Sequence, residues 1–276
     1  MKLLFFDIDG TLADISGKPS QTVVQAIRSA RSRGNKAFLS TGRTELMIPD
    51  AVAAIGFDGM ICNAGARVNA EGQELFDRPM TEDLTSLIIA ALEPEAVHFS
   101  LECQDCLYER EMIPEGFSKE ALINASSELQ RIFQTRQPPI PRYPVSCYTG
   151  QPVYKIPFFS SSVETIGRLE KQLSPFAHVD RFSSPFPTSG LLAAEVSAQG
   201  VDKGSAIRII CRHYGAELHD CVAFGDSMND AQMLKIAGIG VAMGNAPDEV
   251  KVLAGRVCES LSEDGVAKEL YRMGLC

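Results

Sequence analysis

The chain has 276 residues, of which 45% are hydrophobic and 22% charged, a composition typical of a globular protein with room for one large domain or two smaller ones. Its formal net charge of -9 disfavours a general nucleic-acid-binding protein, which would carry a basic stripe. No apolar run approaches the roughly 20 residues of a membrane-spanning helix. The eight cysteines are scattered and there is no export signal, so we expect free thiols in a reducing cytoplasm, with neither a membrane nor nucleic acid as partner.

The first element is a short apolar run, Leu3–Phe6, which predicts a buried parallel strand. Asp7 and Asp9 follow it directly, and Gly10 and Thr11 come next. In open α/β sheets, ligands bind beyond the carboxyl ends of strands. Two neighbouring carboxylates suit a hard cation such as Mg²⁺, and a carboxylate can also act as a covalent nucleophile. Solvated acids at a strand end would give the same local pattern, so this stretch alone leaves both interpretations open.

Helices and strands then alternate up to about residue 80. The expected elements are a helix over residues 20–34, a strand over 36–40, a helix over 44–55, a strand over 58–62 and a hairpin over 67–76. The strand over 36–40 ends at Thr41, Gly42 and Arg43, again a polar group at a strand end. This β-α-β-α-β order is typical of a parallel sheet.

The alternation changes near residue 80. The middle of the chain predicts helices from residue 81, over 118–135 and over 163–173, and strands over 96–101, 106–110, 153–159 and 176–182. Such a mixture indicates a separate α+β module inserted into the first domain. We therefore predict a first core segment over residues 1–81, an inserted α+β domain over 82–186 and a second core segment over 187–276.

The α/β alternation resumes near residue 190. We expect strands over residues 191–196, 220–224 and 239–242, with a helix that begins at Lys203 and a last helix over 264–272. The strand over 220–224 ends at Gly225 and is followed by Asp226, Asn229 and Asp230.

Polar side chains at several strand ends can converge, because parallel strands end on one edge of a sheet. The residue types at these ends suit phosphoryl transfer, which depends mostly on positioning and charge neutralisation. Phosphoryl transfer needs a nucleophile, a metal, cations and hydroxyls for the phosphate oxygens, and an acid for the leaving oxygen. The chain offers a candidate for each.

These residues resemble the four motifs of the haloacid dehalogenase superfamily. The matching stretches are Asp7-Ile8-Asp9-Gly10-Thr11, Thr41-Gly42-Arg43, Lys203-Gly204 and Gly225-Asp226-Ser227-Met228-Asn229-Asp230. The insertion and the stretch from Glu195 to Lys203 resemble the Cof-type branch of this superfamily, which carries a C2B cap. The resemblance implies a Rossmann-like parallel-sheet core with an inserted α+β (C2B) cap domain.

The resemblance also implies catalytic roles. Asp7 would be the nucleophile, Asp9 the general acid and then the general base, while Thr41 and Lys203 would contact the transferring phosphoryl group. Mg²⁺ would be the cofactor, held by Asp7, Asp9 (through its backbone carbonyl), Asp226 and Asp230. Phosphate or substrate contacts would come from Gly10, Thr11, Gly42, Arg43 and Asn229, although Arg43 could equally form a structural ion pair.

The sequence departs from this branch at two places: Ala64 stands where an asparagine is common, with Asn63 one place earlier, and Ala198 replaces a common proline. We expect a Mg²⁺-dependent phosphatase for small phosphorylated metabolites, with a sugar phosphate as the expected substrate, in a monomer or weak homo-oligomer. The alternatives are a phosphatase for a nucleotide or cofactor such as pyridoxal phosphate or FMN, and a phosphosugar mutase. A phospho-aspartate signalling module is a remote alternative, because such modules are about half this length.

Overall fold

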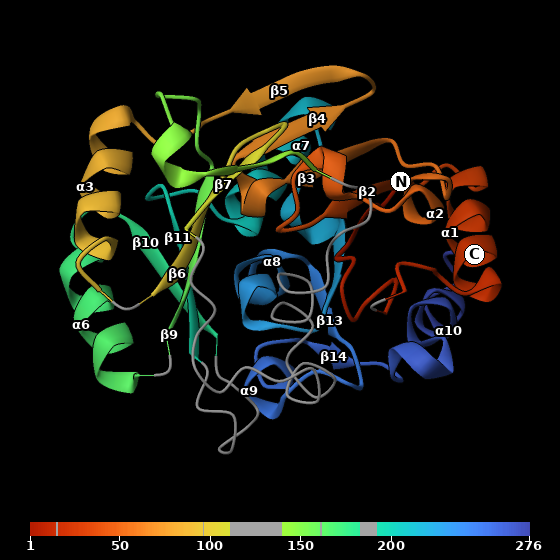
Figure 1. Cartoon of the computed structure of the whole chain (residues 1–276). Helices are drawn as coiled ribbons and strands as arrows, with labels where there is room; N and C mark the ends of the chain where they lie inside the picture. Colours follow the sequence, from red (N-terminus) through yellow and green to blue (C-terminus); the bar gives the residue numbers. More distant parts are fainter. Residues whose placement is uncertain (15, 96, 111–139, 161, 183–191) are drawn as a thin grey trace. The chain divides into compact units, whose positions relative to one another are not determined.

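The computed structural model describes residues 1–14, 16–95, 97–110, 140–160, 162–182 and 192–276 (Figure 1). The chain divides into two compact units. The core unit consists of Met1–Arg43, Ile48–Asp77 and Asp202–Cys276, and the inserted unit consists of Thr44–Met47 and Arg78–Val201. None of the helices in the described ranges is both long and apolar enough to span a membrane.

The core unit contains an eight-stranded sheet in the order β14-β13-β12-β1-β2-β3-β4-β5. The strands are β1 (Leu3–Phe6), β2 (Lys36–Ser40), β3 (Gly59–Cys62), β4 (Arg67–Ala70), β5 (Gln73–Asp77), β12 (Cys221–Gly225), β13 (Ile239–Ala242) and β14 (Arg256–Val257). β14 to β3 run parallel, and β4 and β5 add an antiparallel hairpin at one edge. β1 lies between β2 and β12, so the polar residues that follow these strands come to one edge of the sheet.

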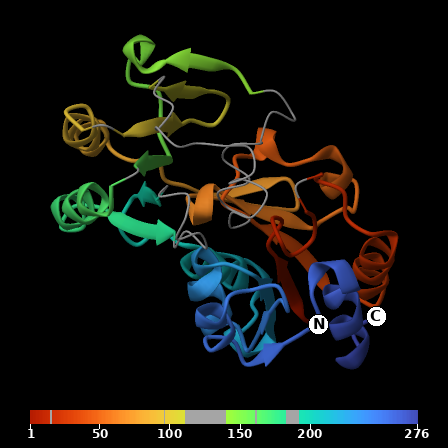
Figure 2. The same cartoon turned by 60° about the horizontal axis from the view of Figure 1, so that its bottom comes forward.

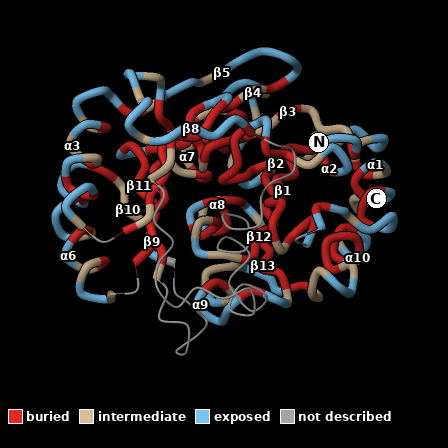
Figure 3. Tube along the Cα trace, in the orientation of Figure 1, coloured by how far each residue is buried: buried red, intermediate tan, exposed pale blue. Residues whose placement is uncertain are grey.

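Helices cover both faces of this sheet. They are α1 (Gln21–Ser32), α2 (Asp50–Ala53), α7 (Lys203–Tyr214), α8 (Ala231–Ile236), α9 (Asp248–Lys251) and α10 (Gly265–Arg272). Leu4 and Phe6 pack in the hydrophobic cluster of α1 and α10, whereas Leu3 and Phe5 pack in that of α7 and α8. β1 is therefore apolar at every position, as expected for a strand buried on both faces (Figure 3). The two chain ends lie close together (Figure 2), and Asn35 contacts both, because it accepts the N–H of Lys2 and donates to the Leu275 carbonyl.

The inserted unit is built on a six-stranded sheet in the order β10-β11-β9-β6-β7-β8. Its strands are β6 (His98–Glu102), β7 (Leu107–Glu109), β8 (Arg142–Pro144), β9 (Lys155–Ser160), β10 (His178–Phe182) and β11 (Leu192–Ser197). All neighbouring pairs are antiparallel except β7 and β8. Helices α3 (Glu82–Leu92) and α6 (Val163–Leu173) pack on one another, and α6 also packs on β9 and β11.

The predicted α/β core with an inserted α+β module is confirmed, but one predicted helix and the sheet assignment of one predicted strand are wrong. The helix expected over residues 44–55 is a 3-10 turn (Glu45–Met47) and the short α2, because Pro49 interrupts it. The strand expected over 191–196 is β11, which pairs with β9 and β10 in the inserted sheet and not in the core sheet. The compact units accordingly divide after Asp77 and Val201, not after residues 81 and 186. The helix predicted over 118–135 lies outside the described residues.

Candidate functional site

Asp7 begins the candidate site at the carboxyl end of β1. Its backbone N–H donates to the Phe224 carbonyl, which continues the pairing of β1 with β12 for one residue. The chain then turns sharply at Gly10, which has a φ of 81°. A Cβ added at Gly10 would lie 2.1 Å from Oδ2 of Asp226, so glycine is required for this close approach between the two loops.

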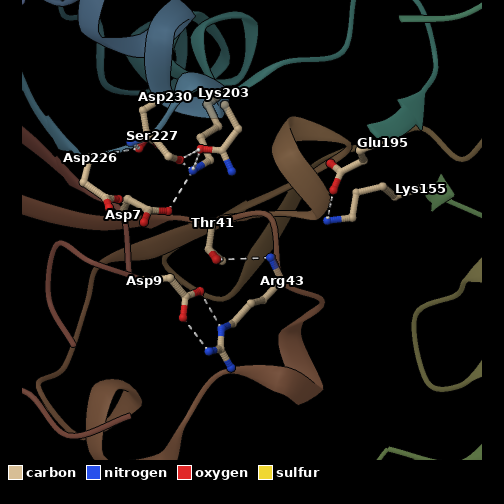
Figure 4. Close-up of polar contacts among 11 residues, drawn as sticks. Asp7, Asp9, Thr41, Arg43, Lys155, Glu195, Lys203, Asp226, Ser227 and Asp230 are labelled. Atoms are coloured by element: carbon tan, nitrogen blue, oxygen red, sulfur yellow. Dashed lines mark hydrogen bonds and ion pairs between the residues drawn. The ribbon is translucent and has the colours of Figure 1, made fainter. Parts of the chain in front are cut away.

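The Lys203 ammonium lies between two carboxylates in the interior of the core unit. Nζ donates to Oδ1 of Asp7 at 2.7 Å and to Oδ1 of Asp230 at 2.6 Å, and all three side chains are buried (Figure 4). Burial alone would lower the pKa of Lys203, but the charges of Asp230 and Asp7 raise it above its ordinary value. Lys203 is therefore positively charged.

Asp7 has two negatively charged neighbours, Asp230 and Asp9, and one positively charged neighbour, Lys203. Burial raises the pKa of Asp7 well above its ordinary value, Lys203 opposes this, and Asp230 and Asp9 raise it further. Oxygens of Asp7, Asp226 and Asp230 all lie within 4.8 Å of one another. Three buried carboxylates beside one ammonium form an oxygen-rich, negatively charged cluster, which is a donor set that fits a hard divalent cation such as Mg²⁺.

Asp230 also shapes the loop after β12. Its Oδ2 accepts hydrogen bonds from the backbone N–H groups of Asp226 (2.9 Å) and Ser227 (3.1 Å), while Oδ1 accepts from Lys203. Both oxygens thus fix Lys203 and Asp226 in place. In the same loop, Oδ1 of Asn229 accepts from the Ser227 hydroxyl at 2.7 Å and from Nζ of Lys203 at 3.4 Å.

Arg43 forms a bidentate ion pair with Asp9. Its Nε lies 2.9 Å from Oδ2 of Asp9 and its Nη2 lies 2.6 Å from Oδ1, and both side chains are buried (Figure 4). The backbone N–H of Arg43 donates to the hydroxyl of Thr41 at 3.1 Å. Of the two roles left open for Arg43, the structure contains the ion pair.

The predicted site residues occur in two groups. The first group surrounds Lys203 and consists of Asp7, Lys203, Asp226, Asn229 and Asp230. The second group lies on neighbouring loops of the core unit and consists of Asp9, Thr41, Gly42 and Arg43. The N–H groups of Gly10 and Thr11, which were expected to face a phosphate, donate to the carbonyls of Ala13 (2.9 Å) and Ile8 (3.3 Å) within the turn. These two N–H groups could bind a phosphate only if their hydrogen bonds to the Ala13 and Ile8 carbonyls were broken.

Two asparagines that sequence reasoning did not assign support these loops. Asn63 donates its backbone N–H to the Arg43 carbonyl. Asn245 donates from Nδ2 to the Gly10 carbonyl and accepts the Leu261 N–H at Oδ1, both at 2.9 Å. Asn63 and Asn245 both lie shortly after a parallel strand of the core sheet. A polar residue at such a strand end is the sequence feature from which both could have been predicted.

The inserted unit contains a separate buried charge cluster. Nζ of Lys155 on β9 lies 2.7 Å from Oε2 of Glu195 on β11 and 3.5 Å from Oε2 of Glu102 on β6. The antiparallel register places these side chains on the same face of the sheet. All three charged side chains are buried.

Comparison with known proteins finds a hydrolase family and several phosphatases. A family model for haloacid dehalogenase-like hydrolases matches residues 4–270. The chain is 26% identical to a phosphoglycolate phosphatase of Methanopyrus kandleri, over 98% of this chain and 96% of that protein. It is 28% identical to an HMP-PP phosphatase of Escherichia fergusonii, over 91% and 86%. Among solved structures, the subclass IIB sugar phosphatase BT4131 superposes with a TM-score of 0.81 at 26% identity and covers 100% of both chains.

Proposed function

Because the chain belongs to the haloacid dehalogenase-like hydrolase family and is a phosphatase of that family, we propose that it hydrolyses phosphomonoesters of small metabolites with Mg²⁺ as cofactor. The observation that carries the proposal is the cluster of Asp7, Asp226 and Asp230 around Lys203. It combines a nucleophile, a fixed positive charge and a set of metal-binding oxygens at the carboxyl ends of parallel strands.

The proposed reaction has two steps. A carboxylate oxygen of Asp7 attacks phosphorus, the bond from phosphorus to the leaving oxygen breaks, and Asp9 gives a proton to that oxygen. Water then attacks the phosphorus of the aspartyl-phosphate and gives a proton to Asp9, and the bond from phosphorus to Asp7 breaks. Inorganic phosphate leaves and both aspartates return to their starting forms.

Lys203 would neutralise negative charge on the transferring phosphoryl group, and the neighbouring oxygens could hold a cation that adds to this effect. Asp7, Asp226 and the backbone carbonyl of Asp9 would hold Mg²⁺, and Asp230 lies beside them. When bound, Mg²⁺ would neutralise negative charge on the phosphoryl oxygens. Thr41 and the amide NH₂ group of Asn229 would donate hydrogen bonds to the phosphoryl group or substrate.

For the leaving group we propose a sugar. Support comes from the similarity to the sugar phosphatase BT4131 over the full length of both chains. The similarity to an HMP-PP phosphatase favours a second candidate, the phosphate ester of a cofactor or cofactor precursor.

A substrate panel tests these proposals. Phosphate release is measured from sugar phosphates, nucleotides, pyridoxal phosphate and FMN, with Mg²⁺ and with EDTA. We expect turnover of sugar phosphates that needs Mg²⁺ and that falls to background in Asp7→Asn, because the amide cannot act as the nucleophile. Metal-independent release, or full activity in Asp7→Asn, would contradict the mechanism. Preference for a cofactor phosphate would contradict only the choice of leaving group.

A further inference from the structure

Arg43 and Asp9 form a buried ion pair that uses both oxygens of the carboxylate. Two parallel N–H···O contacts join the guanidinium to both carboxylate oxygens. This bidentate geometry fixes the plane of the carboxylate as well as its position. The Arg43 and Asp9 side chains are only 6% and 10% exposed, so solvent weakens the pair little.

The backbone of Arg43 is fixed from two sides. Its N–H donates to Oγ1 of Thr41 and its carbonyl accepts the N–H of Asn63. The N–H of Ala64 donates to the Thr41 carbonyl at 3.0 Å. The loop that follows β2 is thus braced by the loop that follows β3, and the guanidinium starts from an anchored backbone.

Proton transfer depends on such anchoring. An acid or base must lie within hydrogen-bond reach of the oxygen that it serves, and misorientation of that group reduces the rate steeply. We propose that Arg43 is a positioning residue, which orients the Asp9 carboxyl group for proton transfer to the leaving oxygen. This inference rests on the proposed phosphatase reaction, and it differs from a direct contact between Arg43 and the phosphate.

A positioning role and a direct phosphate contact predict different effects of Arg43 substitutions when the leaving group of the substrate is changed. p-Nitrophenyl phosphate has a leaving group that departs without protonation, whereas a sugar leaves as an alkoxide unless an acid protonates it. Formation of the aspartyl-phosphate is therefore measured by rapid acid quench with both substrates, which separates this step from hydrolysis of the intermediate. The proteins compared are the wild type, Arg43→Ala, Arg43→Lys, Asp9→Asn and Arg43→Ala combined with Asp9→Asn.

We expect Arg43→Ala to slow phosphorylation by the sugar phosphate toward the rate of Asp9→Asn, a loss within the range of about 10²–10⁴-fold for general acid catalysis. Phosphorylation by p-nitrophenyl phosphate should change several-fold at most. Lysine offers a point charge without the planar fork, so Arg43→Lys should recover only part of the loss. In the Asp9→Asn background, Arg43→Ala should cause no further loss, because its effect acts through Asp9.

Arg31 provides a matched control, because it forms a bidentate pair with Asp58 in the same unit, at 2.9 and 3.0 Å. Arg31→Ala should leave the ratio of the two phosphorylation rates unchanged, and thermal unfolding of every variant reports whether it folds. Equal losses with both substrates, weaker inhibition by inorganic phosphate in Arg43→Ala, or a further loss in the Asp9→Asn background would overturn the positioning role. Absence of Mg²⁺-dependent turnover by the wild type would instead contradict the proposed function.

Discussion

Ala64 occupies a backbone conformation that suits other residues better. It has a φ of 55° and follows Asn63, which has a φ of 51°. Asparagine tolerates this left-handed region, whereas alanine is strained there by about 1–2 kcal/mol. The departure noted in the sequence, alanine in place of a common asparagine, therefore coincides with backbone strain in the loop that braces Thr41 and Arg43.

Replacing Ala64 by glycine should relieve this strain. We expect Ala64→Gly to raise the free energy of unfolding by about 0.5–1 kcal/mol, since the relief exceeds the entropy that glycine loses on folding. Urea unfolding measures the change. Ala66→Gly is the matched control: Ala66 has an ordinary φ of -72°, so the same substitution should destabilise the protein. A decrease of stability in both variants would show that Ala64 is not strained.

For individual residues, the sequence predicted which residues lie at the site better than it predicted which side chains they contact. Asp7, Lys203 and Asp230 converge as expected, because the ends of parallel strands meet at one edge of the sheet. The pair of Arg43 with Asp9 and the contact of Asn245 with Gly10 join loops distant in sequence. Which side chains pair across such distances depends on the three-dimensional position of each loop. A local sequence pattern does not contain this information.

At the scale of elements, Asp58 joins a helix to two strands of the core sheet. It lies just before β3 and accepts hydrogen bonds from Arg31 on α1 and from the N–H of Ala37 on β2. Lys36 on β2 also lies 3.4 Å from Oδ1. Burial would raise the pKa of Asp58, but the hydrogen bonds from Arg31 and Ala37 and the charges of Arg31 and Lys36 hold it below its ordinary value.

This pKa shift makes part of the stability dependent on pH. A carboxyl group with a pKa lowered in the folded state stabilises it above the unfolded pKa, and this contribution is lost as the pH falls through the folded pKa. We expect the stability difference between the wild type and Asp58→Asn to be constant at neutral pH and to shrink below the ordinary value of 3.8. Urea unfolding from about pH 6 to about pH 3 measures it. A stability difference for Asp58→Asn that stays constant over this pH range would contradict the assignment.

β11 shows why strand pairing is harder to predict than strand existence. The sequence predicts a strand over residues 191–196, close to the observed Leu192–Ser197, but its length and composition do not distinguish a core strand from one in the inserted sheet. Glu195 is the distinguishing residue in retrospect, because it forms a buried ion pair with Lys155 of that sheet. A charged residue within a strand is informative only once its partner on another strand is known.

For the molecule as a whole, the cluster of carboxylates opposes folding when no cation is present. Asp7, Asp226 and Asp230 are buried together, and Lys203 supplies one compensating charge. Under the proposed function, the same cluster would lower the stability of the metal-free protein and supply a strong electric field at the reacting phosphate. Binding of a cation to the folded state alone must then stabilise the entire chain.

This linkage gives a whole-molecule prediction. Mg²⁺ at one hundred times its dissociation constant should raise the free energy of unfolding by about 2.7 kcal/mol. Asp226→Asn removes one carboxylate from the cluster, so it should abolish most of this increase and should be at least as stable as the wild type in EDTA. Thermal or urea unfolding at constant ionic strength measures both effects. An equal increase in wild type and Asp226→Asn would mean that Mg²⁺ stabilises the protein elsewhere, and the carboxylate cluster would then not be its site.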